Sequence, residues 1–338
     1  MRMPEFWSRQ RSLTAQLLAP LGWLYGRITL ARLKRRGEKL SVPVIAIGNF
    51  TAGGAGKTPV TLAIASALAK RGVRPFVVSR GYGGSESGPY RVDPLRDSSA
   101  RVGDEPLMMA RSFPVIVSRD RARGGKLALA QGADVILLDD ALQNPDLEKD
   151  FTLGVVDGGF GFGNGFCVPA GPLRAPLAPM LARVDATLVI GADAAKSRDA
   201  LAGKPCFSAS IHVGSGLKST LRGQRVLAYC GIGRPEKFGE TLRECGAEIA
   251  TLLAYGDHHA FTEDDAAHIL SEAIRLRARP VTTEKDAARL VGSVTLEKLK
   301  AASLVVPIRI APPDELLAMI YRAAASSASR ASTASGEE

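Results

Sequence analysis

Short, mainly apolar runs alternate along this chain with longer segments of mixed polarity. The apolar runs lie at 42–47, 74–79, 114–117, 133–138, 151–156 and 186–190. The segments between them, such as 60–69 and 120–131, have the composition of helices. Apolar strands that alternate with helices predict a doubly wound, mostly parallel α/β sheet.

The pattern changes near 205–222, where shorter Gly- and Ser-rich segments predict a linker. A second, smaller α/β unit follows, with expected strands at 225–230 and 280–283. We therefore expect four regions: a basic amphipathic helix (1–40), a larger α/β core (41–215), a C-terminal α/β lid domain (216–322) and a disordered Ala/Ser-rich tail (323–338).

The turn after the first expected strand carries the most specific signal. It is rich in glycine and ends in Gly56-Lys57-Thr58, directly before a segment of helical composition. In that context backbone N–H groups surround a phosphate, the lysine reaches the β/γ-phosphates and the threonine hydroxyl ligates Mg²⁺. The usual pattern has glycine at position 51, where this chain has threonine. The sequence predicts a nucleoside triphosphate site made of Thr51, Ala52, Gly53, Gly54, Ala55, Gly56, Lys57 and Thr58.

Two pairs of acids are candidates for the reaction itself. Asp139 and Asp140 directly follow an apolar strand, the position from which phosphate-loop proteins hold Mg²⁺. Alternatively, Asp140 is a helix N-cap. Asp104 and Glu105 follow a flexible loop, and phosphoryl transfer to an alcohol needs a base or an orienting carboxylate near the hydroxyl. Acids at a helix start are also favourable in themselves.

Basic and imidazole groups complete the candidate chemistry. His258 and His259 follow Asp257, and a histidine beside a carboxylate can relay a proton. A purely structural pair is the alternative, and a zinc site lacks a suitably spaced third ligand. Arg174, in a loop rich in Gly and Pro, is a candidate phosphate clamp.

Charge is concentrated at the amino end. The chain carries a net charge of +10, of which nine Lys/Arg and two Glu place +7 within 1–40. The longest uncharged stretch there, 12–26, is shorter than the about 20 residues that span a bilayer. Aromatic residues flanked by arginines favour a helix on a membrane surface, and packing onto the protein's own core is the alternative.

Amino-acid composition bears on the cellular compartment and on nucleic-acid binding. Four widely spaced cysteines form no metal-binding or disulfide pattern, which favours a reducing cytoplasm. Aromatic content is only 6 %, and no basic stripe interleaves with aromatics, so nucleic-acid binding is disfavoured.

Taken together, the motifs resemble the tetraacyldisaccharide 4′-kinases of lipid A biosynthesis. The matching stretches lie, in the family's order, at 48–59, 79–83, 103–106, 139–140, 169–174, 231–238, 257–259 and 282–286. Two departures stand out, Ala141 and Asn144, where the family commonly has glycine and histidine.

The resemblance implies transfer of the ATP γ-phosphate to the 4′-hydroxyl of an acylated glucosamine disaccharide, giving lipid IVA, at the cytoplasmic face of the inner membrane. It implies that Asp104 is a base acting with a histidine of the Asp-His-His motif, and that Lys57, Thr58 and the Asp139/Asp140 pair hold phosphate and Mg²⁺, joined by Glu105. A competing interpretation is a partitioning-type switch ATPase, but those proteins usually carry a lysine where this chain has Ala52. A nicotinamide dehydrogenase built on 231–233 lacks the third glycine.

Overall fold

The larger lobe is built on one twisted sheet. The computed structural model describes residues 4–9 and 11–334. Eight strands form this sheet in the order β3-β4-β2-β5-β1-β6-β7-β8, and all neighbours pair in parallel except β3 with β4. Their bounds are β1 Val44–Asn49, β2 Pro75–Ser79, β3 Tyr90–Arg91, β4 Val115–Val117, β5 Val135–Asp139, β6 Phe151–Asp157, β7 Ala186–Ile190 and β8 Cys206–Ala209. The predicted fold class is confirmed.

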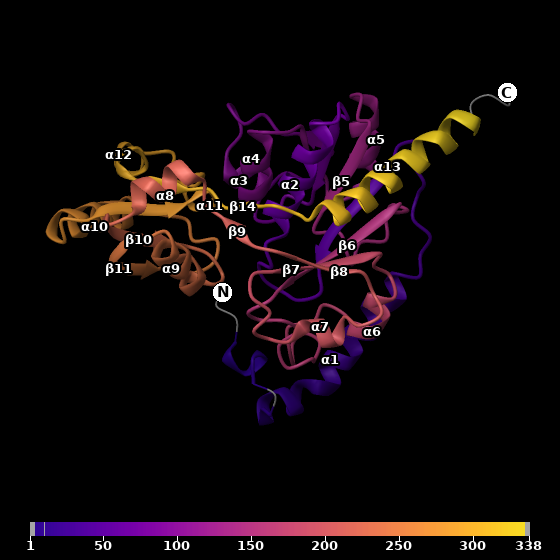
Figure 1. Cartoon of the computed structure of the whole chain (residues 1–338), viewed down its shortest axis with the longest axis horizontal. Coiled ribbons are helices and arrows are strands. Elements are labelled where there is room, and N and C mark those ends of the chain that lie inside the picture. Colours follow the sequence, from indigo (N-terminus) through magenta and orange to yellow (C-terminus); the bar gives the residue numbers. More distant parts are fainter. Residues whose placement is uncertain (1–3, 10, 335–338) are drawn as a thin grey trace.

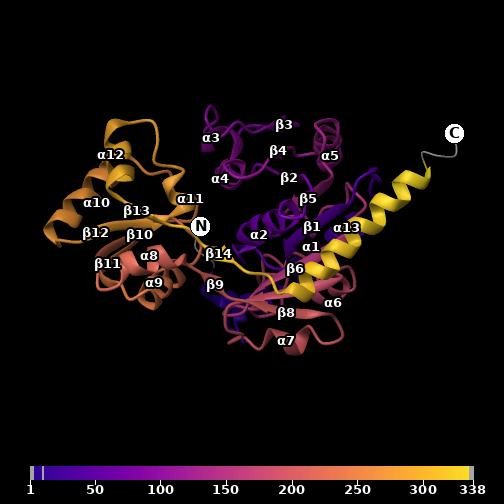
Figure 2. The same ribbon diagram turned by 45° about the horizontal axis from the view of Figure 1, so that its top comes forward.

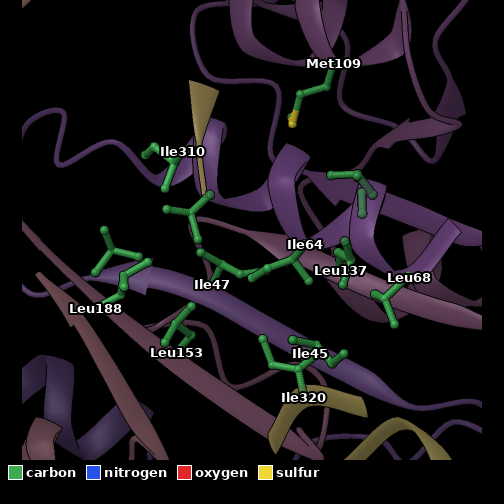
Figure 3. Packing of buried hydrophobic residues seen from close by; sticks show 14 of the residues in the cluster. Ile45, Ile47, Ile64, Leu68, Met109, Leu137, Leu153, Leu188, Ile310 and Ile320 are labelled. Carbon is green, nitrogen blue, oxygen red and sulfur yellow. The ribbon is translucent and has the colours of Figure 1, made fainter. Parts of the chain in front are cut away.

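Helices cover both faces of this sheet, which explains why its inner strands are apolar throughout. On one face Ile64 and Leu68 of α2 pack against Ile45 and Ile47 of β1, as Figure 3 shows. The other helices of this lobe are α3 (Ser99–Val102), α4 (Asp104–Ala110), α5 (Arg121–Ala130), α6 (Leu177–Leu181) and α7 (Ser197–Ala200), and α2 itself spans Lys57–Ala69. The chain enters α2 directly from the centre of the sheet, at the carboxyl end of β1.

The smaller lobe, orange in Figure 1, has a parallel sheet of its own, in the order β11-β10-β12-β13. Its strands are β10 Arg225–Cys230, β11 Glu248–Ala254, β12 Arg279–Thr283 and β13 Leu304–Val306. Its helices are α8 (Ser215–Leu221), α9 (Pro235–Glu244), α10 (Glu263–Arg275), α11 (Glu284–Ala287) and α12 (Val294–Ala302). Separate apolar clusters lie on the two faces of this sheet, so the lobe has a core independent of the first.

Two short strands lie where the chain passes between the lobes. β9 (Ile211–His212) and β14 (Arg309–Ile310) pair in antiparallel fashion, and Figure 2 shows them between the two sheets. Ile310 also packs into the core of the larger lobe. This ribbon lies where the chain connects the two lobes.

The carboxyl-terminal helix corrects two predictions. α13 (Asp314–Ala334) returns to the larger lobe, where Leu316 and Ile320 are fully buried with β1 and α2. The smaller lobe therefore ends before β14 and not at residue 322. The tail expected to be disordered from 323 is helical as far as Ala334, and 335–338 lie outside the described residues. The four-residue spacing of Leu316 and Ile320 buries one helical stripe, a signal that the Ala/Ser-rich composition masks.

The amino-terminal helix presents large apolar side chains to solvent. η1 (Glu5–Trp7) precedes α1 (Leu13–Arg32), which runs along the outside of the larger lobe (Figure 1). Its buried positions are small: a Cβ at Gly22 would lie 2.6 Å from the carbonyl oxygen of Cys167. Leu17 is 82 % exposed and Trp23 63 % exposed. In the described part of the chain no helix has the length and hydropathy needed to cross a membrane.

Candidate active site

The phosphate loop is held in shape by glycines and by a neighbouring loop. Gly53 and Gly56 have φ of +102° and +82°, in the region that side chains disfavour, so both are needed for this turn. Thr51 has no such conformation; its backbone forms a β-bridge with Leu173. The position that departs from the usual pattern therefore has no need for glycine here.

Lys57 lies at the first position of α2 and is almost fully buried. Its Nζ is 3.4 Å from the carbonyl oxygen of Gly53 and 3.7 Å from Oδ1 of Asp140. Both contacts hold the ammonium group over the loop, where it is available to a phosphate.

Asp139 and Asp140 lie in different electrostatic environments. Asp139, the last residue of β5, accepts a hydrogen bond from Thr61 Oγ1 at 3.0 Å. Burial, followed by the nearby charges of Glu105 and Asp140, raises the pKa of Asp139 to about 7. Burial alone would also raise the pKa of Asp140, but Lys57 and Arg174 outweigh it and hold that pKa below its usual range.

Arg174 reaches this cluster from the loop after β6. Its Nη1 donates to both carboxylate oxygens of Asp140, at 2.8 and 3.0 Å. Its backbone N–H donates to the carbonyl oxygen of Phe50, which ties its loop to the start of the phosphate loop. The expected phosphate clamp thus stands beside Asp140 and Lys57.

Oxygen donors at this end of the sheet suit Mg²⁺. Thr58 follows Lys57 at the start of α2, and Asp139, Asp140 and Glu105 interact electrostatically. The described residues contain no group of three His, Cys, Asp or Glu side chains placed to hold a metal by themselves. Mg²⁺ usually keeps water and substrate phosphates among its ligands. The charges of Glu105 and Asp140 add to the effect of burial on the pKa of Asp139, and a divalent cation would offset those charges.

This burial predicts a pH-dependent stability. The pKa of Asp139 rises from 3.8 to about 7 on folding. Its contribution to the free energy of unfolding is therefore fully present below pH 3.8 and is lost as the pH rises through about 7. At pH 8 and without nucleotide, we expect Asp139→Asn to be more stable than the parent chain by about 2–4 kcal/mol in unfolding free energy. This difference in stability should become smaller as the pH is lowered. Thermal melts across this range measure it. Asp134→Asn is the control: Arg74 lowers the pKa of Asp134, so this substitution should reduce stability at high pH instead of raising it. A stability difference between Asp139→Asn and the parent chain that does not change with pH would contradict the prediction.

A second constellation joins the two lobes. Asp104 begins α4 in the larger lobe, and its Oδ2 is 3.0 Å from Nδ1 of His258 in the smaller one. Arg289 Nε donates to the same oxygen at 2.7 Å. Burial would raise the pKa of Asp104, but the hydrogen bonds from His258 and Arg289 outweigh it, so the pKa is lowered.

The neighbours of His258 define its tautomer. Lys285 Nζ is 3.0 Å from Nε2 of His258. An ammonium group only donates, so Nε2 accepts and Nδ1 carries the proton donated to Asp104. His258 has φ of +61°, an uncommon conformation that its contacts maintain.

His259 has a different environment. Its Nε2 is 2.9 Å from Asp265, the N3 residue of α10, and its ring stacks on Tyr255 at 4.7 Å. Of the two expected catalytic histidines, the structure brings only His258 to Asp104.

The two constellations are adjacent. α4 contacts both α2 and α11. Glu105 lies 3.5 Å from Lys285 on one side and acts on the charge of Asp139 on the other. A continuous line of charged groups therefore connects the acids behind the phosphate loop with His258.

Several residues of this site escaped prediction. Arg289 had no assigned role. The sequence predicts Arg121, within 119–123, as a phosphate clamp or as part of a solvated helix face. In the structure it is buried at the start of α5, and its guanidinium donates to the backbone oxygen of Asp139 at 2.9 Å. Lys285 lies in a stretch recognised only by resemblance. No sequence pattern predicted a second contact between the lobes. In it Asp157 forms ion pairs with Arg234 and Lys237, each at 2.9 Å.

The two departures from the family pattern have local explanations. Asn144 receives the backbone N–H of Asp146 at 3.0 Å and donates to its carboxylate at 2.9 Å, so it stabilises a turn. Ala141 is buried without a positive φ, which belongs instead to Asp140 (φ +53°). A glycine is not required at 141 in this backbone.

Comparison with known proteins decides the family. The family model described as tetraacyldisaccharide-1-P 4′-kinase, LpxK, matches residues 14–325. The chain belongs to this family. The tetraacyldisaccharide 4′-kinase of Methylobacterium sp. strain 4-46 is 48 % identical over 332 residues, covering 96 % of this chain and 98 % of its own length. That of Nitrobacter winogradskyi is 49 % identical over 320 residues, covering 93 % and 95 %.

A solved structure supports the same assignment. LpxK from Aquifex aeolicus, crystallised in complex with ATP, is 25 % identical and superposes with a TM-score of 0.69, covering 92 % of this chain and all of that one. The predicted family is confirmed, and the fold of this 4′-kinase is that of a relative known to bind ATP.

Proposed function

We propose that this chain transfers the γ-phosphate of ATP to the 4′-hydroxyl of a tetraacyldisaccharide 1-phosphate, giving lipid IVA. Family membership supports the reaction. The observation that supports the mechanism is the contact between Asp104 and His258, because it joins a histidine of the smaller lobe to α4, a helix that also contacts α2.

The tautomer of His258 supports a specific proton path. When the acceptor hydroxyl takes the place of Lys285 at Nε2, that nitrogen receives the hydroxyl proton as the oxygen attacks the γ-phosphorus. The bond from the γ-phosphorus to the β-γ bridging oxygen breaks, and ADP leaves with that oxygen. Asp104, whose pKa is lowered, remains ionised and stabilises the imidazolium.

The groups at the phosphate loop support charge neutralisation. Lys57 and Arg174 are positioned to stabilise negative charge on the transferring group. Thr58, with Asp139, Asp140 and Glu105, would hold Mg²⁺, and the cation would offset negative charge on the phosphates. The backbone of 51–56 would surround the β-phosphate.

Labelled ATP and the disaccharide lipid test this proposal. Separation of the products by thin-layer chromatography should show label on the lipid. Release of free phosphate with no labelled lipid would instead indicate the switch ATPase.

We also propose that the enzyme works as a peripheral protein at the cytoplasmic face of the inner membrane, where an acylated substrate resides. The exposed apolar side chains of α1 and its flanking arginines support this location. Each exposed leucine gains about 1.5–3 kcal/mol on leaving water.

Charged substitutions on α1 measure the membrane contact. Leu17→Glu with Leu21→Glu should weaken sedimentation with lipid vesicles by at least about tenfold, because two apolar anchors are lost. Thr14→Glu with Gln16→Glu adds the same charge at exposed polar positions and serves as the control. Equal loss in both pairs would mean that charge alone governs binding.

A further inference from the structure

A cavity of about 400 Å³ lies away from the nucleotide loop. It forms where the segment after α1 meets the loop 142–149 and the start of β6. Four cationic side chains line it: Arg35, Arg36, Lys149 and Arg183. No residue of 51–58 contributes to its wall, and we call it the basic cavity.

Its positive charge is largely uncompensated. Within the part of the chain that the structure describes, Arg35, Arg36 and Arg183 form no ion pair. The one carboxylate in the wall, Glu148, lies 3.5 Å from Lys39. Like charges around one hollow attract an anion.

Lys149 shows how close these charges lie. Its Nζ donates to the carbonyl oxygen of Ala141 at 2.8 Å, which leaves further N–H groups for a ligand. Burial, followed by the charge of Arg183, lowers the pKa of Lys149 to about 8, although Asp146 opposes this. A bound anion would relieve that repulsion.

We propose that the basic cavity binds a phosphate ester. Guanidinium groups bind phosphate oxygens in pairs, and an ammonium group adds a point charge. A volume of about 400 Å³ accommodates a glycerophosphate group. Arg35 and Arg36 lie three and four residues beyond the end of α1, whose apolar side chains are exposed, which favours the headgroup of an anionic phospholipid as the source. Only this choice of source rests on the membrane location proposed above.

The first experiment uses a soluble probe. Glycerol 3-phosphate is titrated calorimetrically into the full chain saturated with ADP, which blocks the phosphate loop. Arg36→Glu with Arg183→Glu should weaken this binding by about tenfold or more, and Arg36→Gln with Arg183→Gln by less. Arg222→Glu with Lys298→Glu changes the net charge equally at exposed positions outside the cavity and should leave it unaltered. Matching thermal melts confirm that each variant is folded.

The second experiment identifies the source. The same variants are sedimented with phosphatidylcholine vesicles with and without phosphatidylglycerol. Selective loss of binding to phosphatidylglycerol by the cavity pair indicates a lipid headgroup, whereas loss confined to glycerol 3-phosphate indicates a soluble ester. If the cavity pair and the control pair behave alike with both probes, the site is refuted. Neither probe requires phosphoryl transfer, so an inactive kinase would not affect the result.

Discussion

Lys57→Ala should reduce kcat/KM for phosphoryl transfer by about 100- to 1,000-fold, equivalent to ~3–4 kcal/mol of transition-state stabilisation. Lys57 is the buried cation nearest the phosphate loop, and its Nζ is oriented by Gly53 and Asp140. Its removal leaves Asp140 paired with Arg174, so the backbone should keep its shape. The lipid-labelling assay measures the loss.

The matched control lies on the same helix. Lys70→Ala removes an exposed lysine just beyond the other end of α2 and should leave kcat/KM within about twofold, as surface changes usually do. Retention of transfer by Lys57→Ala would show that the terminal phosphate lies elsewhere. That result would remove the basis for placing the nucleotide between β1 and α2.

Features set by local sequence were predictable. A strand, a glycine-rich turn and a helix in succession fix the backbone around Lys57, and a second apolar strand places Asp139 at the same end of a parallel sheet. Parallel pairing puts the carboxyl ends of both strands together, so a candidate site followed without coordinates.

Features set by packing between distant segments were not predictable. Asp104 and His258 are separated by 154 positions, and nothing local states which of two adjacent histidines turns toward the other lobe. Arg289, 185 positions from Asp104, lies in the turn after α11, without a recognisable pattern. Composition likewise left the position of α13 open, because burial of Leu316 depends on a sheet formed by the opposite end of the chain.

The interlobe contact also favours separate roles for residues that the resemblance treated together. Asp104 has a lowered pKa and an ion pair with Arg289, which favours the proposed orienting role over that of the proton acceptor. His258 offers Nε2 on the side opposite Asp104. Because the two residues come from different lobes, their contact depends on how the lobes sit relative to each other.

His258→Ala should lower kcat by about 100- to 10,000-fold while changing the KM for ATP little, because a general base acts in the transition state and not in nucleotide binding. His259→Ala should have a much smaller effect on kcat and act mainly on stability, since His259 pairs with Asp265 and stacks on Tyr255. Steady-state kinetics of both variants with the lipid acceptor distinguish these roles. Equal losses of kcat would contradict the assignment of His258.

The pairing with Asp104 provides the stricter test. If the two residues act as one unit, Asp104→Asn with His258→Ala should be no slower than His258→Ala alone, because the carboxylate works through the imidazole. Additive losses would mean that Asp104 contacts the substrate independently and accepts the proton itself. Exogenous imidazole should restore part of the activity of His258→Gly but not of Lys57→Ala, since only the former lacks a ring-shaped base in an otherwise intact site.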